Sequence, residues 1–324
     1  MTDRPTTSRR RLLAAVGTAG ASTAIAGCHD DEPRWVAADV PTDAALYDVV
    51  TAADGAYAVG EDGTVIARDD GDWTVRLESG IGGAGDGLRS AAVTSTGRSI
   101  WVAGDGGALG YYDAVADHAV DLSAPNEKTS SWSAVAAAGV DGAERLLVVN
   151  TSGELLAGRR DGATVAWADV VEPGSGSTLA DIDLSAPAGA YAIDTDGGVF
   201  ASTDGGRTWD RIGIADAEVD FAAVAAVDDG HVSVAGGNGT VFSYDGEEWT
   251  RSRLGEQPVG ALVRDRYDAL AVAVDGTVYE RRYGEWTDPD RLPSGNELHA
   301  VTLGTARSPP VVVGESGTAF ERRY

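Results

Sequence analysis

The chain contains very little of several residue types that mark common protein classes. Its 324 residues include one cysteine, Cys28, and one lysine, Lys128. A single cysteine excludes an intrachain disulfide, so stability must come from a buried core. The four histidines are scattered, without the close spacing of a zinc site, at His29, His118, His231 and His299. We therefore expect no metal and no cofactor.

Basic residues are also scarce, since 25 Lys and Arg face 51 Asp and Glu. With no basic stripe to neutralise phosphates, we expect no nucleic-acid binding. An excess of acidic residues with almost no lysine resembles the composition of proteins from halophilic archaea, in which an acidic surface stays hydrated in concentrated salt. We interpret the acidity mainly as an adaptation to the medium, rather than as an interface for a basic partner.

Long apolar runs are absent after the first 27 residues. Arg9, Arg10 and Arg11 precede an Ala- and Gly-rich apolar stretch that ends just before Cys28. The stretch is shorter than the ~20 residues that a membrane-spanning helix needs. The pattern resembles a twin-arginine lipoprotein signal, which implies export, cleavage before Cys28 and lipid attachment to that cysteine. We expect a signal at residues 1–27, a lipidated tether at 28–33 and the folded domain at 34–324.

One short sequence pattern recurs seven times in the folded part: apolar or small residues, a turn that ends in glycine, and a second apolar strand. Its spacing of 37 to 46 residues suits a four-stranded propeller blade. Glycine is expected in the turn because a tight hairpin requires positive φ. The aligned glycines are Gly63, Gly107, Gly153, Gly197, Gly239, Gly276 and Gly317. The sequence predicts an all-β fold, a seven-bladed β-propeller of four-stranded blades, although six or eight blades remain alternatives.

A short segment rich in small residues precedes each hairpin and is expected to form the innermost strand of its blade. These segments are residues 46–51, 88–93, 132–137, 179–184, 221–226, 259–264 and 298–303. A tryptophan is expected to open several outermost strands, at Trp73, Trp167, Trp209, Trp249 and Trp286. The last repeat ends after its third strand. We therefore expect residues 33–37 to pair with 320–324 and to close the ring, which removes an exposed sheet edge.

The most specific local motif lies at residues 202–209, Ser-Thr-Asp-Gly-Gly-Arg-Thr-Trp. It resembles the Asp-box, or BNR repeat, at Ser202, Asp204, Gly206, Thr208 and Trp209. The resemblance implies a structural turn between the third and fourth strands of a blade, with the aspartate capping backbone amides. The whole chain is similar to BNR-repeat propellers of the photosystem II assembly-factor type, within the wider group of WD40- and YVTN-like repeats. That similarity implies partner-protein binding, although the basic partner-binding patch of that family has no counterpart here.

Candidate contact residues lie on the innermost strands. Asp48 and Asp181 share one register, and Tyr47, Arg89 and His299 share the neighbouring one, so they are expected near one mouth of the channel. Trp132 is a further candidate contact, with core packing as the competing interpretation. Two sequons place candidate N-glycosylation sites at Asn150 and Asn238, in predicted turns where asparagine is also favoured by the backbone.

These observations predict a lipid-anchored protein on the outer face of the cytoplasmic membrane, which acts as a non-enzymatic binding or assembly platform for a protein or glycan. A cell-surface glycosidase, sialidase-like or of another type, is the alternative and requires two carboxylates at a suitable separation. A purely structural envelope protein is a third hypothesis. Because Asp-boxes occur in enzymes and in binding proteins, the motif does not decide among them.

Overall fold

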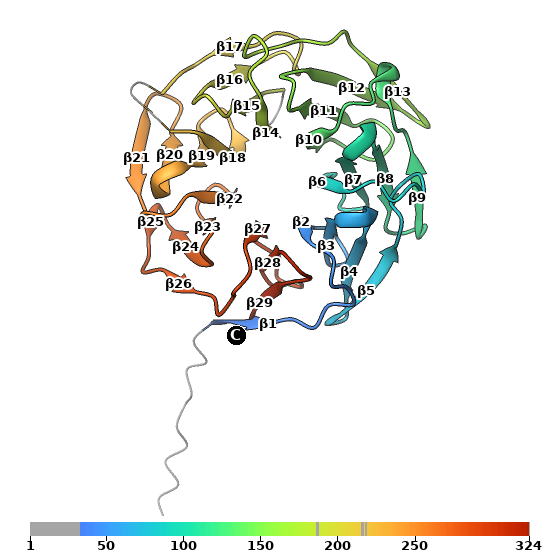
Figure 1. Cartoon of the computed structure of the whole chain (residues 1–324). Helices are drawn as coiled ribbons and strands as arrows, with labels where there is room; N and C mark the ends of the chain where they lie inside the picture. Colours follow the sequence, from blue (N-terminus) through green and yellow to red (C-terminus); the bar gives the residue numbers. More distant parts are fainter. Residues whose placement is uncertain (1–32, 186–187, 215–216, 218, 324) are drawn as a thin grey trace, which may run out of the picture. The chain divides into compact units, whose positions relative to one another are not determined.

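The computed structural model describes residues 33–185, 188–214, 217 and 219–323. The described residues form seven antiparallel sheets that stand as blades around a central axis (Figure 1). The predicted seven-bladed β-propeller is therefore confirmed. The predicted signal and Cys28 lie outside the described residues, so lipid attachment and export stay predictions. Within the described ranges, no helix is long and apolar enough to cross a membrane.

The first five blades each contain four strands that follow the chain from the centre of the ring outward. Blade 1 consists of β2 (Leu46–Thr51), β3 (Ala56–Gly60), β4 (Val65–Asp69) and β5 (Asp72–Leu77), and blade 2 of β6 (Leu88–Val93), β7 (Ser99–Gly104), β8 (Leu109–Asp113) and β9 (His118–Asp121). Blade 3 consists of β10 (Trp132–Ala138), β11 (Arg145–Asn150), β12 (Leu155–Asp161) and β13 (Thr164–Trp167). Blade 4 consists of β14 (Leu179–Leu184), β15 (Ala190–Asp194), β16 (Val199–Ser202) and β17 (Asp210–Arg211). Blade 5 consists of β18 (Phe221–Asp228), β19 (His231–Gly236), β20 (Thr240–Tyr244) and β21 (Trp249–Arg253).

Blade 6 departs from the predicted four strands. It contains β22 (Val259–Arg264), β23 (Ala269–Ala273), β24 (Thr277–Arg282) and two short outer strands, β25 (Glu285–Trp286) and β26 (Asp290–Arg291). Both outer strands pair with β24. Pro289 lies between them, and proline has no amide hydrogen to donate to a strand ladder, which explains the interruption.

Blade 7 closes the ring with both ends of the chain. Its strands are β27 (Leu298–Thr302), β28 (Val311–Gly314), β29 (Ala319–Arg323) and β1 (Arg34–Ala37). β1 is antiparallel to β29, with Arg34 opposite Arg323 and Ala37 opposite Phe320. Figure 1 shows β1 along the outer side of β29. The predicted closure by the N-terminal strand is confirmed.

The hairpins between second and third strands follow the predicted alignment. All seven aligned glycines adopt positive φ, between 62° and 87°. Three of the hairpins contain short 3₁₀ turns, η1 (Glu61–Gly63), η2 (Asp105–Gly107) and η4 (Gly237–Gly239); a fourth, η3 (Pro125–Glu127), lies in a loop between blades 2 and 3. The prediction that tryptophan opens the outer strand was wrong for blade 3, because Trp167 ends β13 and packs back toward Gly158.

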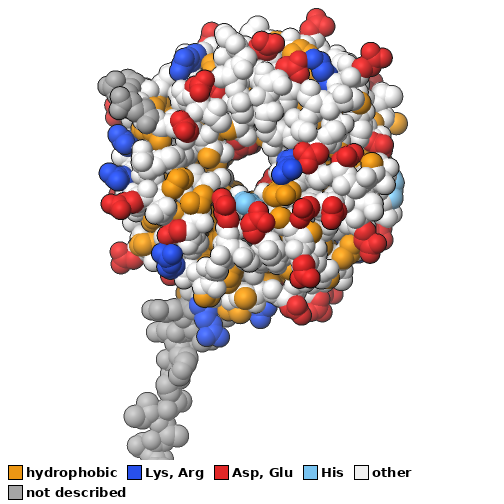
Figure 2. Space-filling view, in the orientation of Figure 1, with side chains coloured by type: hydrophobic (Ala, Val, Ile, Leu, Met, Phe, Trp, Pro, Cys, Tyr) orange, Lys and Arg blue, Asp and Glu red, His pale blue; other side chains and the backbone are white. Residues whose placement is uncertain are grey.

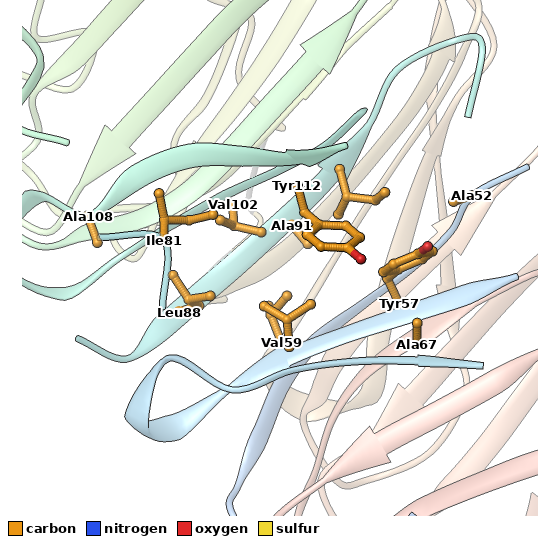
Figure 3. Packing of buried hydrophobic residues seen from close by; sticks show 12 residues of the cluster. Ala52, Tyr57, Val59, Ala67, Ile81, Leu88, Ala91, Val102, Ala108 and Tyr112 are labelled. Atoms are coloured by element: carbon orange, nitrogen blue, oxygen red, sulfur yellow. The ribbon is translucent and has the colours of Figure 1, made fainter. Parts of the chain in front are cut away.

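Hydrophobic side chains fill the spaces between neighbouring blades. The cluster between blades 1 and 2 includes Tyr57 and Tyr112, whose rings lie close together, and Leu88, which lies further along the cluster near Ile81 (Figure 3). Each such Leu or Val contributes about 1.5–3 kcal/mol when it is fully buried. Among the residues that the structure describes, the cluster between blades 5 and 6 is the smallest, with six buried hydrophobic residues, whereas the one in Figure 3 has twelve. The sheets are thus least tightly joined by apolar packing between blades 5 and 6.

A buried polar cluster reinforces the junction between blades 7 and 1. Glu321 of β29 is 1% exposed, and its carboxylate accepts hydrogen bonds from Arg68 Nε at 2.8 Å and Trp73 Nε1 at 2.9 Å. Arg68 and Trp73 belong to blade 1, whereas Glu321 lies on the strand that pairs with β1. Although burial opposes ionisation, the hydrogen bonds from Arg68 and Trp73 outweigh it and lower the pKa of Glu321.

Candidate functional site

All seven innermost strands carry a bulge at the same place. In each blade the second residue of the innermost strand is skipped in the pairing with the next strand. Such a bulge redirects a side chain out of the regular pleat. The seven skipped residues all line the central channel and are Tyr47, Arg89, Ser133, Ala180, Ala222, Gly260 and His299. One ring of equivalent positions therefore surrounds this mouth of the channel.

The large side chains of this ring are confined to blades 7, 1 and 2, which are adjacent. The His299 and Tyr47 rings lie with their centroids 5.7 Å apart. The Arg89 guanidinium carbon lies 4.4 Å from the centre of the Tyr47 ring, in cation–π geometry. The other four blades contribute only Ser, Ala or Gly at this position. The large side chains thus lie on one side of the channel mouth. We call His299, Tyr47 and Arg89 the mouth cluster.

Two carboxylates hold the ends of the mouth cluster. Arg89 Nη2 donates to Asp105 Oδ2 at 2.8 Å, and His299 Nε2 lies 2.9 Å from Glu315 Oε1. The hydrogen bond that Arg89 donates to Asp105 raises the pKa of Arg89, so the guanidinium keeps its charge. The Arg89 side chain remains 42% exposed and can reach a ligand. Figure 2 shows a basic side chain and a histidine at the rim of the central opening, with acidic side chains around them.

A cavity of about 470 Å³ adjoins the mouth cluster on the side of blade 3. Its lining includes Trp132, Ser133 and Thr151 besides the mouth cluster. Trp132 is only 1% exposed and belongs to the core between blades 2 and 3, which agrees with the competing interpretation of core packing. Its indole N–H has no hydrogen-bond partner among the described residues. The structure thus brings together four of the six predicted contact residues around one cavity.

The other two, Asp48 and Asp181, lie one residue deeper in the channel. Asp48 accepts hydrogen bonds from its neighbour's amide, Val49, and from Ala91 of blade 2, at 2.7 Å each. Asp181 does the same with Ile182 at 2.8 Å and Val224 of blade 5 at 2.9 Å. Each carboxyl group therefore joins two adjacent innermost strands.

Asp183, two residues further along β14, repeats this arrangement and was not among the predicted site residues. Burial raises the pKa of Asp48 and of Asp183 to about 6 each. Burial, with repulsion from Asp183 and Asp48, raises that of Asp181 to about 8. The channel cavity that Asp48 and Asp181 line measures about 170 Å³, below the 300–1,000 Å³ typical of small-molecule pockets.

These raised pKa values predict a loss of stability as pH rises. A carboxyl group with a raised pKa holds its proton more tightly when folded, so its contribution to stability falls above the unfolded pKa, here from about pH 4 to pH 8. Asp181 is only partly buried, so screening by solvent reduces its contribution, and we expect its share of the decline between pH 5 and pH 8 to be about 2 kcal/mol. Chemical denaturation of the native protein and Asp181→Asn in constant high salt will measure it. Over this pH range, the free energy of unfolding of Asp181→Asn should fall less than that of the native protein, by about 2 kcal/mol. Asp210→Asn, at an exposed position of β17, should show the same decline as the native protein.

The turn whose sequence resembles an Asp-box lies between β16 and β17, far along the chain from the mouth cluster. Asp204 Oδ1 accepts hydrogen bonds from the amides of Arg207 and Thr208, at 3.0 Å each. The backbone amide of Thr208 is the main cause of the lowered pKa of Asp204, about 2. Gly206 N donates to Ser202 Oγ, and Trp209 Nε1 donates to Gly206 O. All of these contacts lie within the turn, so Asp204 holds the loop together.

The two sequons differ in how the fold presents them. Asn150 is fully buried; its amide nitrogen donates to Glu154 at 2.9 Å, and its side-chain oxygen accepts two backbone amides. Asn238 is exposed in the η4 turn at φ 59°. The folded protein therefore presents Asn238 and not Asn150 to solvent. No group of three or more His, Cys, Asp or Glu within the described ranges could hold a metal ion.

The comparisons with known proteins are informative at the level of the fold. No protein-family model matches the chain, and the search of curated proteins finds no match. Among solved structures, YCF48 from Cyanidioschyzon merolae is 14% identical, with a TM-score of 0.67, and the match covers 89% of this chain and 98% of that one. A structure of YCF48 bound to D1 peptide gives 13% identity and a TM-score of 0.69, covering 91% and 96% of the two chains. Virginiamycin B lyase from Staphylococcus aureus is 11% identical, with a TM-score of 0.74 and coverage of 90% and 100%. The fold is thus shared by binding proteins and by an enzyme.

Proposed function

We propose that this β-propeller is a non-enzymatic platform that binds a partner protein at the channel mouth. The observation that carries the proposal is the mouth cluster: His299, Tyr47 and Arg89 are contiguous on three adjacent blades and border a cavity of about 470 Å³. Arginine and tyrosine are enriched among the residues that dominate binding energy at protein interfaces. Asp105 and Glu315 hold the cluster in place before a partner arrives, which lowers the entropic cost of binding.

The chemistry of the cluster indicates what part of a partner it would bind. Arg89 offers a cationic donor beside the Tyr47 ring, and both residues line the cavity. A carboxylate or carbonyl group next to an apolar side chain complements these features. The similar fold of YCF48, which has been solved with a bound peptide, is compatible with such a role. A purely structural envelope role would leave this preorganised cluster without a ligand.

The channel carboxyl groups favour binding over glycoside hydrolysis. Asp48 and Asp181 are both engaged by two backbone amides, and the cavity between them is small. A glycosidase needs one carboxylic acid and one carboxylate that face a sugar, with room for a water or a nucleophilic attack. We therefore assign these groups to the joining of blades. We further propose that lipid on Cys28, after twin-arginine export, holds the platform at the outer face of the cytoplasmic membrane.

The test is capture of partners from native membranes in high salt by the full chain, with mass spectrometry of the retained proteins. We compare the native protein, Arg89→Ala with Tyr47→Ala, and Arg211→Ala as a control on the exposed strand β17. A partner that binds through the mouth cluster should be retained by the native and control proteins and lost at least tenfold by the double variant. Equal retention by all three proteins would contradict the proposal, and recovery of the protein alone would favour a structural role.

A further inference from the structure

A second cavity, of about 430 Å³, lies between blades 5 and 6. Its wall includes Arg264, the last residue of β22, whereas Gly260 near the start of β22 faces the mouth described above. A strand rises about 3.3 Å per residue, so Gly260 and Arg264 mark opposite ends of β22. The two sites therefore lie toward opposite faces of the propeller. The apolar cluster between blades 5 and 6 is the smallest of the interblade clusters, so the sheets leave room here.

Two arginines in this cavity lack carboxylate partners. Arg264 Nη1 donates to Ser233 Oγ at 2.9 Å and its Nε to Asp265 O at 3.1 Å, while Arg281 Nε donates to Gly284 O at 3.0 Å. Within the part of the chain that the structure describes, neither forms an ion pair. Burial, followed by repulsion from Arg281, lowers the pKa of Arg264 to about 10. In a protein with twice as many acidic as basic residues, two adjacent unpaired guanidinium groups are unfavourable unless an anion joins them.

Asp228 and Asp265 attract the Arg264 guanidinium electrostatically, but the carboxylates near this cavity are hydrogen-bonded to other groups. Asp228 is held by Arg266 and by His231 Nδ1, the latter at 2.6 Å. Asp245 accepts the amides of Glu247 and Glu248 within its own turn, and Asp265 similarly accepts those of Tyr267 and Asp268. The charge of the arginine pair is therefore only partly balanced by the protein.

Aromatic and hydroxyl groups complete the cavity wall. Tyr267 is 64% exposed and Tyr283 is 90% exposed, and they are the two aromatic residues among the exposed large hydrophobic side chains in the described ranges. Both line this cavity, together with the hydroxyl-bearing residues Ser243, Thr250 and Ser252. Exposed aromatic rings are costly to hydrate and cover flat apolar faces well. Several hydroxyls around them suit a ligand with many hydroxyl groups of its own.

We propose that this cavity binds an acidic sugar residue, with the arginine pair on its carboxylate or sulfate. The guanidinium groups of Arg264 and Arg281 match planar or tetrahedral oxyanions through paired N–H donors. Tyr267 and Tyr283 cover the C–H face of the sugar ring, and the serine and threonine hydroxyls bond to its hydroxyl groups. This site is separate from the mouth cluster, so it can be occupied whether or not a partner protein binds there.

Calorimetric titration of the purified full chain in constant high salt tests the proposal, with glucuronate, glucose and sodium sulfate as probes. We expect glucuronate to bind at least tenfold more tightly than glucose or sulfate. Arg281→Gln should weaken glucuronate at least tenfold, because it removes a charged hydrogen-bond donor. Arg307→Gln, with the same change of charge at an exposed position outside this cavity, should leave the affinity unchanged.

The thermal midpoint without ligand separates loss of binding from loss of folding. Since Arg281→Gln removes a like charge beside Arg264, its midpoint should stay the same or rise. Equal affinity for glucuronate and glucose, or for glucuronate and sulfate, would overturn the proposal, as would equal effects of the two variants. Tighter binding of a poly-glutamate peptide than of glucuronate would instead assign the cavity to an acidic protein segment.

Discussion

Deletion of Arg34–Ala37 is expected to lower the thermal midpoint by at least about 10 °C and to make the protein self-associate. The deletion removes the whole of β1, exposes the hydrogen-bonding edge of β29 and strips Trp35 from the core between blades 6 and 7. A free sheet edge is a template for pairing with another chain. A loss of a few kcal/mol shifts the midpoint by roughly 2–4 °C per kcal/mol in a domain of 150–250 residues. Scanning calorimetry and light scattering in high salt measure the two effects.

The matched control is deletion of residues 29–32, which shortens the chain by the same number of residues before β1. This deletion should leave the thermal midpoint unchanged, and light scattering should show no self-association. If removal of β1 changed neither quantity, the ring would be held by interblade packing alone, and pairing of the two chain ends would contribute nothing to stability.

Glu321→Gln is expected to lower the free energy of unfolding by about 3–5 kcal/mol, the usual cost of breaking a buried ion pair by changing one partner. The substitution keeps the size of the side chain but leaves the Arg68 guanidinium, whose side chain is 15% exposed, without its counter-charge. Trp73 Nε1 also loses a charged acceptor at the same junction. Urea denaturation at pH 7 provides the measurement, with Glu285→Gln on the exposed part of β25 as the control.

The pH dependence supplies a second check on this pair. Because the pKa of Glu321 is lowered in the folded state, its contribution is present above the unfolded pKa and is lost as pH falls through the folded value. The difference between native protein and variant should therefore shrink below about pH 4. A constant difference across that range would mean that packing of the side chain, rather than its charge, supports the closure.

Much of the fold could be predicted from the sequence because its signals are local and repeated. A hairpin needs a residue that accepts positive φ, and Gly63 and its six equivalents supplied this at a period that suits one blade. The absence of a fourth strand after the last repeat predicted that residues near Trp35 would close the ring. The split outer edge of blade 6 could not be predicted in this way, because it depends on how β24 pairs around Pro289.

The candidate sites were predicted only in part. Alignment of the innermost strands placed Tyr47, Arg89 and His299 in one register, because equivalent residues of a repeat occupy equivalent positions around the ring. Their partners Asp105 and Glu315 come from the hairpins, and no periodic pattern identifies them.

Tertiary structure alone decided which groups are buried or left without partners. Asn150 belongs to a sequon and is a candidate for glycosylation from the sequence. In the structure it is buried, and its side-chain amide donates a hydrogen bond to Glu154 within its own turn. In the sequence, Arg264 and Arg281 are two ordinary charged residues, but β22 and β24, which flank β23 in blade 6, bring them into one cavity. Sequence by itself determined the repeat, the turns and the closure, since backbone conformation and strand pattern depend on near neighbours. Burial, charge pairing and cavities depend on residues tens of positions apart, and only the assembled ring sets those distances.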